Sequence, residues 1–349
     1  MSHLRNPFFL GATLLASLAF TYHYFLYTHE YPPGSYQRIA AYEADKVFQT
    51  RILVTTLANM LEPTLPLLQA TFHTIVPYPI DYEVLLQLLN VCFLSALLLS
   101  MPSLLKVLEI RVSPWWSFLL LLPLYWNYVA LNGLIDGAGL YYPYDLPSLT
   151  FFTIGVILFI RCQWLLLYPW FVIALLNRES ACFLTLAGFI LSVRFSSSPS
   201  DFLRENRHLL FHVSAQACLW IGSRLLLSHT FRDNPGEFFE TPHSMTLFLS
   251  HAVTATPHWA MENPRWFLTL FAGIWLFPLL AFKKLNSMTR RFLIVGVIYL
   301  TALIFRSNMM ETRVYNELNV VLTTAAIAAI HSWLQTHRST TYSSQATHA

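Results

Sequence analysis

"ALLNRESACF", residues Ala174–Phe183, is the stretch that decides how this chain is expected to fold. It lies within a mostly apolar run from 163 to 193, yet four polar residues follow one another in it: Asn177, Arg178, Glu179 and Ser180. One Arg or Asp at the centre of a membrane helix costs about 2.5–3.5 kcal/mol on insertion scales. We therefore do not expect these residues in the middle of a single long span.

The length of this run favours a hairpin. As one helix, residues 163–194 would measure about 47 Å, against a hydrocarbon core of about 30 Å. As two antiparallel arms, each would measure about 22 Å, with the polar apex slightly below the membrane surface. Polar groups at that depth are tolerated only where protein covers them or where they line a watery cavity. The apex is therefore expected to lie beside other polar segments.

The composition of the whole chain indicates a polytopic membrane protein. Of its 349 residues, 55% are hydrophobic and 11% are charged, whereas charged residues normally make up about 25% of a soluble domain. We expect an all-α fold in a single transmembrane domain, residues 1–336, followed by a disordered cytoplasmic tail, residues 337–349. Apolar runs of suitable length predict about ten transmembrane helices, at residues 7–27, 84–104, 115–132, 146–161, 163–177, 181–194, 208–227, 265–282, 291–306 and 315–334.

Lys and Arg in the short loops predict the orientation, because they favour the cytoplasmic side. If Arg5 holds the N-terminus inside, the basic cluster at 283–291 and the C-terminus also lie inside. The outer side then collects acidic, Arg, Tyr and His residues. The broken apolar stretch 52–76 of its first loop is expected to form helices in the interface. The formal charge of +3 is too small to indicate a nucleic-acid partner.

Two outer loops offer candidate carboxylates. In "YEADKVFQTRIL", a carboxylate could take a proton from an attacking hydroxyl as a general base, and Asp45 is favoured over Glu43. Arg51 follows as a candidate binding residue; the alternative for this loop is a solvated surface. In "YYPYDLP", Tyr144 and Asp145 are candidate binding residues, although an N-cap followed by an early proline explains Asp145 fully.

Arg178 and Glu179 would point about 100° apart on a helix, so each needs a partner elsewhere. The guanidinium fork of arginine is a good phosphate ligand. An internal ion pair between helices is the alternative. Since apolar packing could replace such a pair at little cost, a binding role is favoured.

The last outer segment, "METRVYNEL", places Arg313 and Glu317 four residues apart, and likewise Glu311 and Tyr315, so that each pair shares a helix face. Binding roles are favoured for Glu311, Arg313 and Glu317. An interhelical salt bridge, with Arg178 as a partner for Glu317, is the alternative.

No metal site is predicted. The histidines of the fourth outer loop lack a ligand spacing, and the four cysteines have neither a disulfide pattern nor a metal-ligand spacing: these residues are His243, His251, His258, Cys92, Cys162, Cys182 and Cys218. No Gly-rich phosphate loop or serine elbow is present in the sequence. A divalent cation stays open as a cofactor.

The order of these parts resembles the C-type polytopic glycosyltransferase superfamily. "FQTRIL", "YPYDLPSL", "NRESACF" and "ETRVYNEL" are similar to elements of a bacterial branch of membrane proteins. The resemblance implies a bacterial inner-membrane enzyme with both termini in the cytoplasm. It would transfer a sugar from a polyprenyl-phosphate donor to an acceptor on the extracytoplasmic side.

The resemblance also implies roles for individual residues. A first-loop carboxylate, Asp45 or Glu43, would be the base, and Arg178 and Arg313 would hold the lipid phosphate. The remaining acids would orient these arginines or bind sugar hydroxyls: Glu179, Glu311 and Glu317. Many members have two adjacent acids in the first loop, whereas this chain has Glu43-Ala44-Asp45, which leaves the identity of the base open.

Two other functions fit the same residues. Polar residues in spans also mark the pathways of transporters and lipid flippases, although no second copy of the "NRES" hairpin suggests an inverted repeat. A non-catalytic membrane assembly protein is the third alternative. Membrane lipids are expected partners in every case. The sequence does not specify the donor sugar, the acceptor or the oligomeric state.

Overall fold

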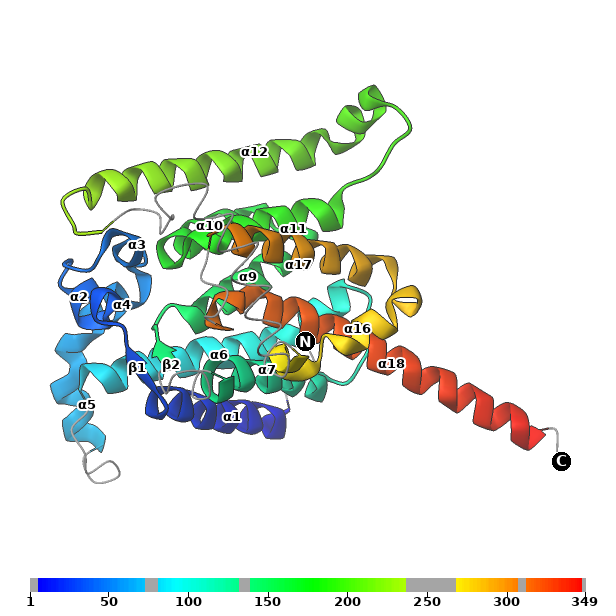
Figure 1. Ribbon diagram of the computed structural model, residues 1–349, viewed down its shortest axis with the longest axis horizontal. Coiled ribbons are helices and arrows are strands. Elements are labelled where there is room, and N and C mark those ends of the chain that lie inside the picture. The colour runs from blue at the N-terminus through cyan, green and yellow to red at the C-terminus, as the bar shows by residue number, and fades with distance from the viewer. Residues whose placement is uncertain (1–5, 73–80, 132–138, 237–267, 307–311, 347–349) are drawn as a thin grey trace.

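The computed structural model describes residues 6–72, 81–131, 139–236, 268–306 and 312–346. These residues form a bundle of long helices lying side by side (Figure 1). Four helical segments of these ranges are long and apolar enough to cross a membrane: α1 (Pro7–Leu26), α6 (Tyr82–Val107), α12 (Pro199–Thr230) and Thr312–Thr336. The last segment comprises η10 (Thr312–Tyr315) and most of α18 (Asn316–Ala346). The chain is therefore mostly helical and of the membrane type, as expected.

Local signals explain where α1 and α6 begin. The Asn6 side chain accepts hydrogen bonds from the amides of Phe8 and Phe9, and Pro7 occupies the first turn of α1. The Asp81 side chain caps α6 in the same way, accepting from the amide of Val84. Such caps satisfy amides that have no partner within the helix.

Three shorter apolar helices pack side by side in the bundle: α9 (Asp145–Ile160), α10 (Trp164–Asn177) and α11 (Cys182–Ser192), the last preceded by η6 (Glu179–Ala181). α10 runs antiparallel to α9, because the Trp170 indole donates to the Phe151 carbonyl at 2.9 Å and Asn177 Nδ2 donates to the Tyr144 carbonyl at 3.0 Å. At this second contact the end of α10 reaches the beginning of α9.

α11 runs parallel to α9, so the chain reverses direction between α10 and α11. A Cβ at Gly155 would lie 1.9 Å from Leu184 Cδ1, and one at Gly188 would lie 2.3 Å from the Phe159 ring. These two glycines therefore let α11 approach α9 closely. The reversal occurs at Arg178, whose backbone is extended (φ −160°, ψ 145°).

α12 covers both arms of this reversal (Figure 1). Arg224 Nη2 donates to the Leu175 carbonyl of α10 at 2.7 Å, and Thr185 of α11 donates to Gln216 Oε1 at 2.7 Å. α12 therefore lies along both α10 and α11.

The loop after α1 folds against the end of the bundle that holds Asp145, which we call the Asp145 end. It contains short helices: η2 (Pro32–Gly34), α2 (Tyr36–Ala40), α3 (Lys46–Gln49), α4 (Leu53–Leu61), η3 (Glu62–Thr64) and α5 (Leu65–Phe72). Its first strand, β1 (Thr28–Glu30), pairs in parallel with β2 (Gly139–Tyr141), which leads into α9. The chain after α12 returns to this loop, where Asn234 Nδ2 donates to the Ala44 carbonyl at 2.8 Å.

Two segments expected as regular helices are irregular. The first consists of η4 (Pro114–Leu120), α7 (Leu121–Tyr125) and a π-helical turn, η5 (Trp126–Ala130). The second consists of η8 (Leu270–Gly273), α16 (Leu276–Leu280) and η9 (Phe282–Lys284), and it precedes α17 (Ser287–Arg306). They are joined by buried Asn127, whose side chain accepts from the Phe271 amide and donates to Asn319, both at 3.0 Å.

At the C-terminus, α18 continues to Ala346. The helix thus extends into the stretch 337–349, for which the sequence favoured disorder, as an arm beyond the bundle (Figure 1).

Candidate functional site

The buried carboxylate of Asp145 joins the two arginines that the sequence selected as phosphate ligands. Asp145 is the first residue of α9 and is fully buried. Its Oδ1 accepts from Arg178 Nη1 at 3.1 Å, and its Oδ2 lies 3.8 Å from Arg313 Nη1. The Arg313 guanidinium also lies 3.7 Å from the centre of the Tyr142 ring, a cation–π geometry. The reversal at Arg178 and the start of the last helix therefore meet at one residue.

This contact corrects the alternative interpretation of Asp145. An N-cap lies before the helix and binds its amides, whereas Tyr144 has the N-cap position and Asp145 is already helical. The Asp145 carboxylate instead contacts the side chains of Arg178 and Arg313.

Arg51 binds the other charged residue of the "NRES" turn. Its Nε and Nη2 donate to the two Glu179 oxygens at 3.1 and 2.5 Å, and its Nη1 donates to the Tyr144 hydroxyl at 2.8 Å. Burial alone would lower the pKa of Arg51, but the Glu179 carboxylate outweighs it, and the pKa is raised well above its ordinary value. Burial raises the pKa of Tyr144 to about 12, against the effect of the neighbouring Arg51. Arg51 is therefore charged and Tyr144 protonated at neutral pH.

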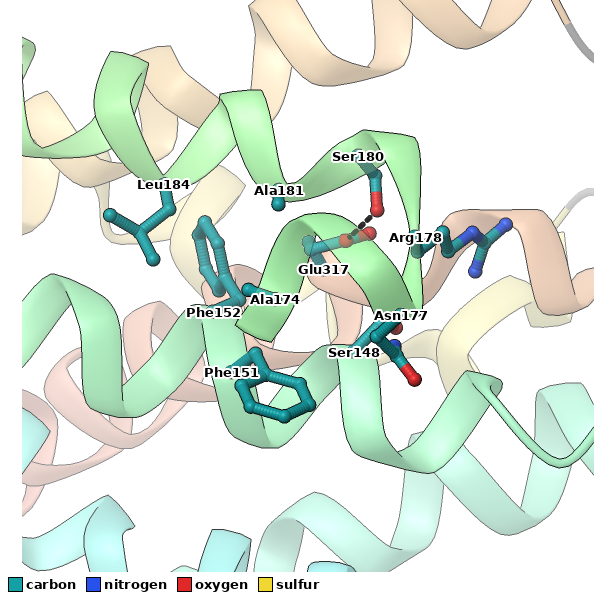
Figure 2. Close-up of a pocket in the computed structure, with 10 residues that line it drawn as sticks. All are labelled: Ser148, Phe151, Phe152, Ala174, Asn177, Arg178, Ser180, Ala181, Leu184 and Glu317. Carbon is teal, nitrogen blue, oxygen red and sulfur yellow. Dashed lines mark hydrogen bonds between the residues drawn. The ribbon is translucent and has the colours of Figure 1, made fainter. Parts of the chain in front are cut away.

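Glu317 is held by hydroxyl groups. Ser180 donates to its Oε1 at 2.5 Å (Figure 2), and the hydroxyl of Tyr299 on α17 donates to its Oε2. The i,i+4 pairing with Arg313 expected from the sequence is replaced by these contacts. η10 holds Arg313 in a 3-10 turn before α18 begins, and the guanidinium lies at Asp145.

A small cavity of about 10 Å³ lies beside these residues and has room for about one water molecule. Figure 2 shows its lining, which includes Ser148, Asn177, Arg178, Ser180 and Glu317. Within the described part of the chain, the buried Asn177 Oδ1 has no hydrogen-bond partner.

Sequence reasoning missed Arg224. It lies on α12, only 7% exposed, and binds the Leu175 carbonyl; the neighbouring Trp220 indole donates to the Glu179 carbonyl at 3.0 Å. Among described residues, Arg224 Nε has no hydrogen-bond partner. The available signal was a lone Arg inside the apolar run 208–227, an arrangement that is costly in a span.

These residues form one cluster, which we call the arginine network: Arg51, Asp145, Arg178, Glu179, Arg224, Arg313 and Glu317. In the described ranges it contains four guanidinium groups and three carboxylates. Excess positive charge inside a protein is expensive unless an anion joins it. The network is therefore chemically suited to hold an anionic group.

The candidate bases lie outside the arginine network. Asp45 is the N-cap of α3, with 29% of its side chain exposed, and its nearest cationic atom in the described structure is Arg38 Nη1 at 4.0 Å. Glu43 is exposed, and its carbonyl accepts from Arg38 Nη2 at 2.9 Å. Arg51, the candidate binding residue of this loop, pairs with Glu179 of the "NRES" turn. Glu311 lies outside the described residues.

Within the part of the chain that the structure describes, no group of three or more His, Cys, Asp or Glu residues could hold a metal ion. His243, His251 and His258 fall outside that part. Comparison of the chain with family models, curated proteins and solved structures returns no match.

Proposed function

We propose that this protein is a membrane-embedded glycosyltransferase that moves a sugar from a polyprenyl-phosphate donor to an acceptor on the extracytoplasmic side. The observation that carries the proposal is the arginine network. Three of its four buried guanidinium groups pair with the carboxylates of Asp145 and Glu179. The fourth, that of Arg224, binds the Leu175 carbonyl beside the same turn. A phosphate on a lipid carrier is an anion that can reach such a cluster from within the membrane.

In the proposed topology the chain crosses the membrane ten times, and α10 and α11 form a hairpin of two short spans. Four long and three short apolar helices of the described ranges account for seven of them. The irregular segments 114–130 and 270–284 and the helix α17 would supply the other three. The basic residues of the short loops would then face the cytoplasm. The arginine network would lie near the outer interface, at the depth of a lipid phosphate.

Arg178 and Arg313 are the proposed phosphate ligands. Both contact Asp145, one at 3.1 Å and the other at 3.8 Å, so this carboxylate holds the two guanidinium groups together before the donor binds. Arg51 and Glu179 brace the "NRES" turn through two hydrogen bonds. Preorganised cations of this kind stabilise the charge that develops on a leaving phosphate.

Asp45 is the proposed base, with Glu43 as the alternative. Asp45 is partly exposed and lies where the loop after α1 meets the chain after α12, whose Pro235 carbonyl accepts from the Lys46 amide at 2.9 Å. In the reaction, the acceptor oxygen would form a bond to the anomeric carbon as the bond from that carbon to the phosphate oxygen breaks. Asp45 would take the acceptor proton, and the polyprenyl phosphate would leave with its negative charge against the arginines.

Mass spectrometry of cell lipids tests this function. In cells that lack the protein, a polyprenyl-phosphate sugar should accumulate, and wild-type protein should restore its consumption. Asp45→Asn and Arg178→Gln should each fail to restore consumption while the protein still reaches the membrane. Arg207→Gln, an exposed change on α12 far from the network, should behave like the wild type.

The same experiment separates the alternatives. In cells that lack a flippase, the lipid-linked sugar would accumulate on one face of the membrane only. Its total consumption would be unchanged once both faces were made accessible, and that outcome would indicate a flippase. Full restoration by both Asp45→Asn and Arg178→Gln would reject the assigned roles.

A further inference from the structure

The end of the bundle opposite Asp145 carries a second site, in a large hollow. α9 separates the two ends by about 24 Å, the length of its 16 residues. The hollow has a volume of about 1250 Å³. Its lining comes from the starts of α1 and η4, from the ends of α6 and α9 and from residues 331–335 of α18. The basic side chains among them are Lys106, Arg111, Arg161 and His331.

Three of the basic side chains of this hollow have no partner among the described residues. Lys106, Arg111 and Arg161 are exposed, and within the described ranges none of their side chains makes a hydrogen bond or an ion pair. No acidic residue is among the described residues that line the hollow. Within the described ranges, three guanidinium or ammonium groups thus line a shared space without a carboxylate partner, which favours an anion there.

The surroundings of the hollow indicate that this anion is attached to an apolar body. Exposed aromatic residues lie on the same segments: Phe8 follows Asn6 on α1, Trp115 precedes Trp116 on η4, and Trp333 lies between His331 and Leu334 on α18. Trp115 and Trp333 are about half exposed, at 46% and 54%. Exposed Trp residues gather at the boundary between the membrane and water.

We propose that this hollow binds the phosphate headgroup of an acidic phospholipid. Lys106, Arg111 and Arg161 would neutralise the phosphate. Polar lining residues would bind the glycerol hydroxyls of the headgroup: Asn6, Ser103, Ser113 and Gln335. The acyl chains would extend along the exposed aromatic residues into the membrane. This site is separate from the arginine network and does not depend on a transferase activity.

Native mass spectrometry of the full-length protein in detergent tests the proposal, with dihexanoyl phosphatidylglycerol as the acidic probe and dihexanoyl phosphatidylcholine as the zwitterionic one. Wild type should bind the acidic lipid more tightly. Each of Lys106→Gln, Arg111→Gln and Arg161→Gln should weaken that binding about fivefold, and the triple variant about 100-fold. Ser113→Glu, which adds a negative charge at the exposed rim, should also weaken it.

A matched control removes the same charge from the same end of the bundle. Arg207, Lys283 and Lys284 are exposed and do not line the hollow, so changing all three to Gln should leave binding of the acidic lipid within about twofold. Equal losses in the two triple variants would overturn the proposal, because general surface charge would then explain the binding. Equal affinity for the two lipids would overturn it as well.

A third probe, glycerol 3-phosphate, distinguishes a lipid headgroup from a soluble phosphate. Binding at least tenfold weaker than that of the acidic lipid supports the lipid assignment. Equally tight binding of glycerol 3-phosphate would overturn it and identify a site for a soluble phosphate ester.

Discussion

The two ends of the bundle treat positive charge in opposite ways. At the Asp145 end, Arg51, Arg178 and Arg313 are buried and each lies against a carboxylate. At the other end, Lys106 and Arg161 are exposed, without ion pairs in the described structure. Buried charges need a fixed partner because water cannot solvate them, whereas exposed charges remain available for a mobile partner. The charges at the Asp145 end are therefore expected to contribute to the stability of the fold, whereas the exposed charges at the opposite end are not.

Of the changes that test this contrast, a substitution of Asp145 is expected to lower stability the most. Asp145→Ala would leave Arg178 and Arg313 buried without their shared carboxylate, and removing one partner of a buried ion pair costs about 3–5 kcal/mol. We expect a loss of that size in the free energy of unfolding, measured by denaturant titration in detergent. Asp145→Asn, which keeps the shape but not the charge, is the matched control. A loss below 1 kcal/mol for Asp145→Ala would mean that the pairing does not stabilise the fold.

A smaller effect is expected at Glu179, whose side chain is 37% exposed. Glu179→Gln should lower the free energy of unfolding by about 1–3 kcal/mol. The reason is that the charged, buried Arg51 loses the carboxylate that accepts its two hydrogen bonds. In a double-mutant cycle, adding Arg51→Gln should cost less than it does in the wild type. Strict additivity of the two changes would show that Arg51 and Glu179 do not interact.

The close packing of α11 against α9 can be tested by substituting Gly155. Gly155→Ala would place a methyl group 1.9 Å from Leu184, and such overpacking costs about 1–3 kcal/mol. Gly222→Ala on α12 is the matched control, since nothing lies within 4 Å of its Cβ position. Alanine is the better helix former there, so this control should be neutral or stabilise by up to about 1 kcal/mol. Similar thermal shifts for the two variants would contradict a close approach of α9 and α11.

The smallest effect is expected at the opposite end. Lys106→Gln and Arg161→Gln should each change the free energy of unfolding by no more than about 0.5 kcal/mol, since both side chains are exposed and unpaired among described residues. The measurement is the same denaturant titration, in detergent free of acidic lipid. A loss above 1 kcal/mol would show that these cations take part in the fold and would remove the contrast between the two ends.

Sequence reasoning found the anomalous residues but not their partners. The cost of ions in a span was enough to select Arg178 and Glu179, and their adjacent positions implied two separate partners. Those partners, Asp145 and Arg51, lie 33 and 128 positions away along the chain. No local periodicity encodes contacts at such separations, so they had to come from the structure.

The errors have physical causes as well. Asp145 matched a helix-cap pattern, because an acid beside an early proline fits that local rule whatever its side chain contacts. Arg224 was passed over because the apolar residues around it dominated the assignment of its segment as a span. The irregular turn at Trp126–Ala130 contains Asn127, which bonds to Phe271 and Asn319, and a hydropathy profile does not register such long-range contacts.

The short parallel pairing of β1 with β2 has a mechanical consequence. Glu30 is in register with Tyr141, and the rigid start of α9 follows only four positions later at Asp145. We expect a displacement of the chain that follows α1 to be passed through this strand pair to the start of α9. A ligand that displaced the loop after α1 would thus move the Asp145 carboxylate without touching it.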